Sequence, residues 1–353
     1  MKEIDTILSE VLLENKSPSV QYLFFDKHQI LKKYSAGFAD IKASNVVGRN
    51  TTYNAFSVTK TYTALAILQL AAAKKLEIDK PVKSYLPHFP YNPVITIRQL
   101  LSHSAGIPNP IPLSWIHLTN EHSSFDRNKF FTGVFARHKK SKSAPNEKFS
   151  YSNLGYVLLG ELIEKMSGLS YEQYVTENII AKLGLTENQL GFEIAADGSH
   201  AKGYQKQLSW MNLLLGFFID KSKYMLETEG HWKPFKNYYV NGASYGGLIG
   251  TPDAFVRYIR ELMNPGSLLI TDDFKKMLFT ENYTRNHKAT GMCLSWFSGK
   301  VKGRRYFAHA GGGGGYYCEI RMYPEAGRGS VLFFNRTGMG DERFLDRVDP
   351  LMW

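Results

Sequence analysis

A serine and a lysine three residues apart offer the most direct chemistry in this sequence. Ser57 and Lys60 open an almost continuously apolar stretch that reaches Leu76. Three residues along a helix bring two side chains onto one face, so the amine reaches the hydroxyl. Apolar neighbours exclude water from the amine, which lowers its pKa and makes it a proton acceptor. The spacing predicts a nucleophilic serine, against the alternative of a helix-start serine beside a surface lysine.

Two other serines compete for this role. Ser199 and Lys202 repeat the spacing, but they stand in a glycine-containing loop where nothing fixes their geometry. Ser244 lies in Gly242-Ala243-Ser244-Tyr245-Gly246, which matches the G-x-S-x-G nucleophile elbow. That motif needs a helix directly after the serine, whereas the helix signal here appears only at Thr251. We therefore interpret 242–250 as a glycine-rich turn.

Two further motifs agree with Ser57. Tyr151-Ser152-Asn153 opens an apolar helical stretch, and a phenol near a lysine ammonium has a depressed pKa that suits proton transfer. His309-Ala310-Gly311 closes a predicted strand and continues into the glycines 312–315. Glycines leave backbone N–H groups free to hold an oxyanion along an exposed strand edge. The alternatives are a core tyrosine with an asparagine cap and a flexible turn.

Periodicity predicts the elements that position these residues. Residues 18–42 alternate as a β-hairpin, and the stretch from Ser57 to Leu76 has no polar face, as in a central buried helix. Four strand-like runs follow near the other end of the chain, at Met292–Phe297, Arg305–His309, Tyr316–Tyr323 and Ser330–Phe334.

Helix signals dominate the middle of the chain. Thr96 and Ser170 begin capping boxes, and Gly168 and Gly184 stand where helices end, while Thr251-Pro252 starts a helix through Met263. We predict an α+β fold with an antiparallel sheet from the N- and C-terminal segments, flanked by helices, and a mostly helical second lobe. Residues 1–75 and 241–353 form the sheet region, 76–240 the helical region, and the active site lies between them.

Composition excludes several classes of protein. The 353 residues are 43% hydrophobic and 21% charged, which excludes disordered and fibrous chains. The net charge of +11 is scattered in pairs such as Lys139-Lys140, so we expect no nucleic-acid partner. Cys293 and Cys318 make no disulfide framework, and no metal-ligand spacing occurs, so we expect neither metal nor cofactor.

The sequence contains no apolar run long enough to span a bilayer. No secretory signal is visible at the start of the chain, so we expect a cytoplasmic protein, or a periplasmic or secreted one if a signal was trimmed.

In chain order, Ser57-x-x-Lys60, Tyr151-x-Asn153 and His309-x-Gly311 resemble the three active-site motifs of the serine β-lactamase and penicillin-binding-protein superfamily. The similar branch holds class C β-lactamases, D-Ala-D-Ala carboxypeptidases and family VIII carboxylesterases. The stretches 55–60, 95–106, 149–156 and 246–253 extend the likeness over roughly residues 18–336.

This resemblance implies a role for each site residue. Ser57 attacks a carbonyl and becomes acylated, while Lys60 and Tyr151 transfer its proton. Tyr151 protonates the leaving group and later activates water. Asn153 hydrogen-bonds Lys60 and the acyl side of the substrate. The backbone N–H groups of Ser57 and Gly312 form the oxyanion hole.

One departure from the family pattern bears on the substrate. Such β-lactamases usually carry Lys-Thr-Gly where this chain has His309-Ala310-Gly311, and a histidine that is half-charged at most binds a carboxylate poorly. A β-lactamase would need another cation near His309, and Arg304 and Arg305 are expected at the far end of the strand.

We therefore expect a carboxylesterase acting on small acyl esters, with a small-molecule ester or amide as its partner. A β-lactamase or D-Ala-D-Ala carboxypeptidase is the alternative, and a non-catalytic binding module is a more remote one. Aromatic residues of the middle region predict an apolar pocket wall or plain core, namely Trp115, Trp210, Phe217 and Phe218.

Overall fold

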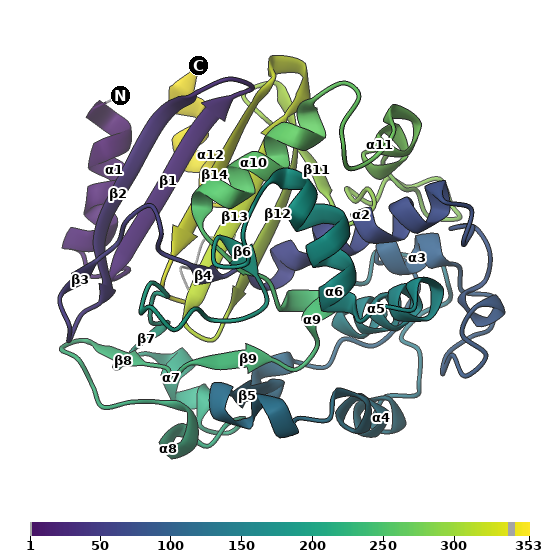
Figure 1. Ribbon diagram of the computed structural model, residues 1–353, viewed down its shortest axis with the longest axis horizontal. Coiled ribbons are helices and arrows are strands. Elements are labelled where there is room, and N and C mark those ends of the chain that lie inside the picture. The colour runs from purple at the N-terminus through teal and green to yellow at the C-terminus, as the bar shows by residue number, and fades with distance from the viewer. Residues whose placement is uncertain (1, 338–342) are drawn as a thin grey trace.

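The main sheet joins the two ends of the chain, as predicted. The structure is a computed structural model that describes residues 2–337 and 343–353 (Figure 1). Its sheet is seven-stranded and antiparallel, in the order β11-β12-β13-β14-β1-β2-β3. The strands are β1 (Ser19–Asp26), β2 (Ile30–Asp40), β3 (Asn45–Val46), β11 (Phe297–Val301), β12 (Arg304–Gly313), β13 (Tyr316–Tyr323) and β14 (Arg328–Phe334).

Both faces of this sheet are covered. Side chains alternate along a strand, so Tyr22 and Phe24 of β1 join one core cluster while Leu23 and Phe25 join the other. The first cluster is closed by α1 (Lys2–Leu13) and α12 (Leu345–Val348), and α10 (Pro252–Met263) packs on the opposite face (Figure 1). The helix α1 was not predicted from the sequence.

The predicted buried helix lies between the sheet and the other helices. It is α2 (Thr59–Ala72), preceded by a 3₁₀ turn at Phe56–Val58, and its residues 59–68 are all buried. It contacts α5 (Asn153–Ser167) and α9 (Ala243–Gly246). The helix ends at Ala72 rather than Leu76.

The middle region mixes helices with short strands. Both predicted capping boxes are present, and Gly168 and Gly184 end helical turns with a positive φ. Besides α5, its α-helices are α3 (Ile97–Leu101), α4 (Arg127–Arg137), α6 (Tyr171–Val175), α7 (Trp210–Leu215) and α8 (Lys221–Tyr224). The short strand sets are β5 (Ile116–Leu118) with β9 (Tyr238–Val240), β7 (Tyr204–Lys206) with β8 (Trp232–Pro234), and β4 (Tyr53–Asn54) with β10 (Ile249–Gly250) and β6 (Leu190–Gly191). The proposed boundaries at 76 and 240 stay a prediction.

One predicted strand is misplaced. The run at 292–297 was expected to be extended, but β11 begins only at Phe297. Ser295 has a φ of +69°, which breaks an extended chain there. The helix predicted from Thr251 matches α10 at both ends, because the Thr251 hydroxyl accepts the Ala254 N–H at 3.3 Å. After it comes α11 (Asp272–Leu278).

The sheet meets the serine segment at Gly311. A Cβ on Gly311 would lie 2.1 Å from the carbonyl oxygen of Ala55 and 3.0 Å from the Ser57 nitrogen. Only glycine allows β12 to approach the segment before α2 this closely. This contact sets the distance between the strand and Ser57.

We expect Gly311→Ala to lower the free energy of unfolding by about 1–3 kcal/mol, because the methyl group must displace backbone. Gly312→Ala is the matched control, since a Cβ there would have its nearest atom at 3.7 Å. Urea denaturation of both variants measures the difference. Equal losses in the two variants would contradict this account of the contact.

Candidate active site

Ser57 lies in the tight turn that leads into α2. The preceding residue, Phe56, has a φ of +43°, a left-handed conformation that is strained for a phenylalanine. The Ala55 carbonyl accepts hydrogen bonds from the Val58 N–H at 3.1 Å and from Cys318 Sγ at 3.2 Å. These contacts hold the turn, so Ser57 stays partly exposed at the start of a buried helix.

Lys60 is fully buried one turn further on. Its Nζ lies 3.0 Å from Ser57 Oγ and donates to the Tyr245 carbonyl of α9 at 2.7 Å. The rings of Tyr151, Tyr156 and Tyr245 lie around it, with centroids 5.1 to 5.5 Å away. No described carboxylate forms an ion pair with this amine, and burial holds its pKa well below the usual lysine value. A neutral amine this close to a hydroxyl can accept its proton.

Tyr151 stands immediately before α5, next to Ser57. Burial raises the pKa of its phenol, while a hydrogen bond with the Ser57 side chain acts in the opposite direction. The expected depressed pKa is therefore wrong. The expectation needed a lysine ammonium beside the phenol oxygen, whereas Lys60 is desolvated and lies over the ring face. Tyr151 is thus a neutral hydroxyl group placed to relay a proton.

Asn153 makes a different contact from the one expected. Its side-chain Oδ1 is buried and has no hydrogen-bond partner among the described residues, so the predicted bond to Lys60 is absent. The backbone N–H of Asn153 instead donates to Asn109 Oδ1 at 3.0 Å. The Tyr245 carbonyl takes the position at Lys60 that Asn153 was expected to fill.

His309 and His103 are neutral histidines of opposite tautomer. His309 Nδ1 lies 2.5 Å from the Ser295 carbonyl, which can only accept, so Nε2 carries the lone pair. His103 Nδ1 accepts the Ser152 N–H at 3.1 Å, so its proton is on Nε2. Burial and the nearby Lys60 lower the pKa of His309 to about 3, and burial lowers that of His103.

His103 also supports the phenol. Its ring stacks on that of Tyr151 with centroids 4.1 Å apart and holds the Ser152 backbone next to it. Sequence reasoning gave His103 no role, although it falls within one of the stretches that resemble the family. Tyr245 was also missed, because it contributes a backbone carbonyl, which leaves no signal in side-chain type.

The strand edge expected beside the serine is present. Pairing of β12 with β11 ends at Ala308, so from His309 onward that side of β12 has no strand partner in the described part of the chain. Gly312 lies on this free stretch and is exposed, one residue beyond the contact between Gly311 and Ala55. The backbone N–H groups of Ser57 and Gly312 stay our prediction for the oxyanion hole.

Neither competing serine has the required surroundings. Ser199 stands in a loop, and Lys202 is ion-paired with Asp40 at 2.9 Å and Glu229 at 3.0 Å, so its amine is not available. Ser244 does start a helix, the single turn α9, which the glycine-rich sequence did not predict. Its side chain is buried against Gly160 of α5, where a Cβ would come within 2.4 Å of the Ser244 oxygen.

Comparison with known proteins agrees with this geometry. Residues 4–349 match the β-lactamase family. The chain belongs to the β-lactamase family. Among its relatives, protein flp of Staphylococcus aureus strain MRSA252 is 31% identical over 212 residues, which cover 58% of this chain and 41% of that protein. Penicillin-binding protein 4* of Bacillus subtilis strain 168 is 26% identical over 349 residues, 92% of this chain and 72% of that one.

Solved structures of this family have the same fold. An octameric penicillin-binding protein homologue from Pyrococcus abyssi has a TM-score of 0.80 at 22% identity, covering 99% of this chain and 76% of that one. A class C β-lactamase has 0.74 at 17%, covering 99% and 94%. The D-amino acid amidase of Ochrobactrum anthropi has 0.76 at 19%, covering 99% and 97%. At these identities the likeness establishes the fold alone, and the chain matches about two fifths of the length of the S. aureus relative.

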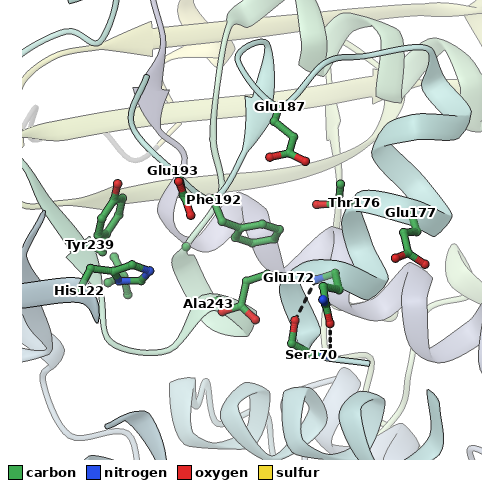
Figure 2. A pocket seen from close by; sticks show the side chains of 13 residues that line it. His122, Ser170, Glu172, Thr176, Glu177, Glu187, Phe192, Glu193, Tyr239 and Ala243 are labelled. Carbon is green, nitrogen blue, oxygen red and sulfur yellow. Dashed lines mark hydrogen bonds between the residues drawn. The ribbon is translucent and has the colours of Figure 1, made fainter. Parts of the chain in front are cut away.

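A separate acidic hollow lies beside α9 in this β-lactamase-family chain. It encloses about 490 Å³, and its lining includes Ala243 and Tyr239 but none of the Ser57, Lys60 and Tyr151 side chains (Figure 2). Four glutamates surround it, namely Glu172, Glu177, Glu187 and Glu193. No group of three or more His, Cys, Asp or Glu side chains in the described parts of the chain is arranged to hold a metal ion.

We expect Ser57→Ala to lower ester turnover by at least about 10³-fold, because the nucleophile is removed. Ser244→Ala is the matched control and should stay within a few-fold of the parent protein. Steady-state kinetics with a p-nitrophenyl ester measures both. Full activity in Ser57→Ala, or an equal loss in Ser244→Ala, would contradict the assignment.

The pH dependence of kcat/KM should report Lys60. Its pKa is lowered, so the reactive neutral amine forms as pH rises through a value below 10.5, and the rate should rise with it. His309 has a pKa of about 3 and Tyr151 has a raised pKa, so neither group accounts for this rise in rate. His309→Gln should therefore keep the rising limb, whereas a rate independent of pH would exclude Lys60 as the base.

Proposed function

We propose that this chain is a serine hydrolase that cleaves small, uncharged acyl esters through an acyl-enzyme at Ser57. The observation that carries the proposal is the fully buried Lys60 amine, 3.0 Å from Ser57 Oγ and without a carboxylate partner among the described residues. A desolvated lysine is costly to keep in a purely structural role. This cost argues against the remote alternative of a non-catalytic binding module.

The side chains of the site can transfer every proton that acylation and deacylation require. Ser57 Oγ attacks the ester carbonyl and its proton passes to Lys60 Nζ, while backbone N–H groups hold the oxyanion. Collapse of the intermediate breaks the C–O bond, and Tyr151 gives its proton to the leaving alkoxide and regains one from Lys60. Water then attacks the acyl group with its proton taken up by the same pair, which releases the acid and restores Ser57.

The charge of the site favours neutral substrates. His309 is 1% exposed and neutral, because its pKa is about 3, and Ala310 has no hydroxyl. The two arginines of the same strand are placed elsewhere: Arg304 lies over the ring of Trp353 and Arg305 over that of Phe307. A substrate carboxylate therefore meets no cation from β12. Because β12 offers no cation to bind a carboxylate, an uncharged ester is favoured over a β-lactam.

A second candidate is cleavage of β-lactams or of D-Ala-D-Ala peptides. Family membership, the match to penicillin-binding protein 4* and the class C β-lactamase fold favour it. The amidase with the same fold extends the candidates to small amides. A cytoplasmic location stays a prediction.

The two candidates are separated by one comparison. The purified chain is given a short-chain p-nitrophenyl ester and a chromogenic cephalosporin in parallel, with Ser57→Ala as the control for each. We expect kcat/KM for the ester to exceed that for the cephalosporin by at least about 100-fold. A reversed ratio would establish a β-lactamase and contradict the esterase proposal.

A cation introduced on β12 tests whether this strand selects substrates by their charge. We expect the double substitution His309→Lys and Ala310→Thr to raise the ratio of cephalosporin to ester kcat/KM at least about tenfold, because a cation and a hydroxyl then face the carboxylate. Ester turnover by the same variant shows that it is folded. An unchanged ratio in an ester-active variant would mean that β12 does not set substrate charge.

A further inference from the structure

Residues 207–231 form an excursion between the paired strands β7 and β8, and they carry apolar side chains into solvent. Leu208 is 91% exposed, Leu213 57% and Phe217 80%, and Phe218 is also exposed. The helices α7 and α8 of this excursion lie at the lower edge of the molecule, away from the main sheet (Figure 1). The sequence predicted that Phe217 and Phe218 lie in a pocket wall or in the core. Both are exposed to solvent instead, so this prediction is wrong. Trp115 is buried in the core, and the side chain of Trp210 lies outside the described residues.

α7 ends at Leu215, and both this helix and the turn after it carry apolar residues. Leu215, the last residue of α7, and Ile219, beyond the turn, are buried against the protein. Leu213 of α7 and Phe217 of the turn are exposed and form the outer face of this segment. A helix on the surface of a globular protein normally has a polar outer face. This outer face has no partner among the described residues and is suited to an apolar one.

Lysines border the exposed face. Lys233 of β8 is paired with Gln205 and Lys206 of β7 with Trp232, so these two lysines lie on opposite faces of the β7–β8 ribbon. The Lys221 side chain passes within 3.5 Å of the Cβ position of Gly216, which lies between the two outward residues. Burial and the charge of Lys233 lower the pKa of Lys221, so Lys221 and Lys233 lie near each other.

The acidic groups of the excursion do not neutralise these lysines. Asp220 caps α8, Glu229 binds Lys202 at 3.0 Å, and the exposed Glu227 forms no ion pair with a described residue. No described carboxylate forms an ion pair with Lys206, Lys221 or Lys233, whereas Lys223 is paired with Glu121 at 2.7 Å. The face is therefore apolar with a positively charged border.

We propose that this surface, formed by Leu208, Leu213, Phe217 and Phe218 and bordered by lysines, docks on a membrane that contains anionic lipid headgroups. Apolar side chains enter the boundary between headgroups and acyl chains, while lysines meet the headgroup charge. A second copy of the chain fits less well, because it would bring lysines against lysines. No helix in the described ranges is long and apolar enough to cross a bilayer.

Docking would bring the lipid phase near the Ser57 centre. The Tyr204 N–H of β7 donates to the Gly315 carbonyl at 3.2 Å, and the Tyr238 hydroxyl donates to the Gly314 carbonyl at 2.7 Å. These glycines follow Gly312 in the turn after β12, so the base of the excursion is attached to the site. Docking itself does not depend on the proposed esterase activity, because it is measured without turnover.

Vesicle sedimentation of the full chain tests the docking surface. The chain is mixed with vesicles of phosphatidylcholine alone or of phosphatidylcholine with 30 mol% phosphatidylglycerol. We expect binding to the anionic vesicles only, weakening as salt is raised. The variant L213S/F217S should lose at least about tenfold in partition coefficient, and K233E should weaken binding to the anionic vesicles.

The control is V94S/L268S, which removes two apolar side chains that are 60% and 69% exposed elsewhere. It should bind like the parent chain, and all variants should hydrolyse a soluble p-nitrophenyl ester at the parental rate. Equal binding by L213S/F217S and the control, or no binding to anionic vesicles, would overturn the proposal. The other candidate partner for this face is a second copy of the chain, which analytical ultracentrifugation would detect. A dimer that is abolished by L213S/F217S, without vesicle binding, would assign the face to a second copy.

Discussion

The structure depends on keeping one amine out of water. Lys60 lies in the first turn of a helix whose next two turns are buried on every side, and no described carboxylate balances it. An unpaired ammonium is unfavourable there, so burial lowers the pKa of the amine, whose polar contacts are Ser57 and the Tyr245 carbonyl. Burying α2 completely requires the sheet on one side and α5 and α9 on the other. The layers of the fold and the chemistry of the serine therefore follow from the same requirement.

Neutrality extends through the rest of the site. His309 and His103 are both uncharged, and each is held in one tautomer by a backbone group from a distant segment. Tyr151, stacked on His103, keeps its proton because its pKa is raised. Acyl transfer in such a site starts from neutral groups, and a positive charge appears on Lys60 only when it takes the Ser57 proton. The oxyanion that develops on the substrate is stabilised by backbone dipoles.

Local spacing predicted much of this, and long-range packing decided the rest. The three motifs, the buried helix, α10 and the hairpin depend on patterns within a few turns of chain, and all of them are present. The contact partners of Asn153 and Lys60 depend on where α9 places a carbonyl, which no local pattern specifies. The pKa of Tyr151 was predicted with the wrong sign because its direction depends on whether Lys60 is charged after folding. The helix at residues 2–13 was missed although Ile4, Leu8 and Val11 have helical spacing, and the strand at 292–297 was misplaced by the left-handed Ser295.

The most direct test of the central claim is the titration of Lys60 itself. The chain is produced with lysine labelled with ¹³C at Cε, and Lys60→Gln identifies the Lys60 resonance by its loss. We predict that the Lys60 signal changes with pH well below the other lysines, whose usual pKa is about 10.4. A Lys60 signal that titrates together with the remaining lysines would mean that the amine is an ammonium at neutral pH. That result would contradict its role as the proton acceptor for Ser57.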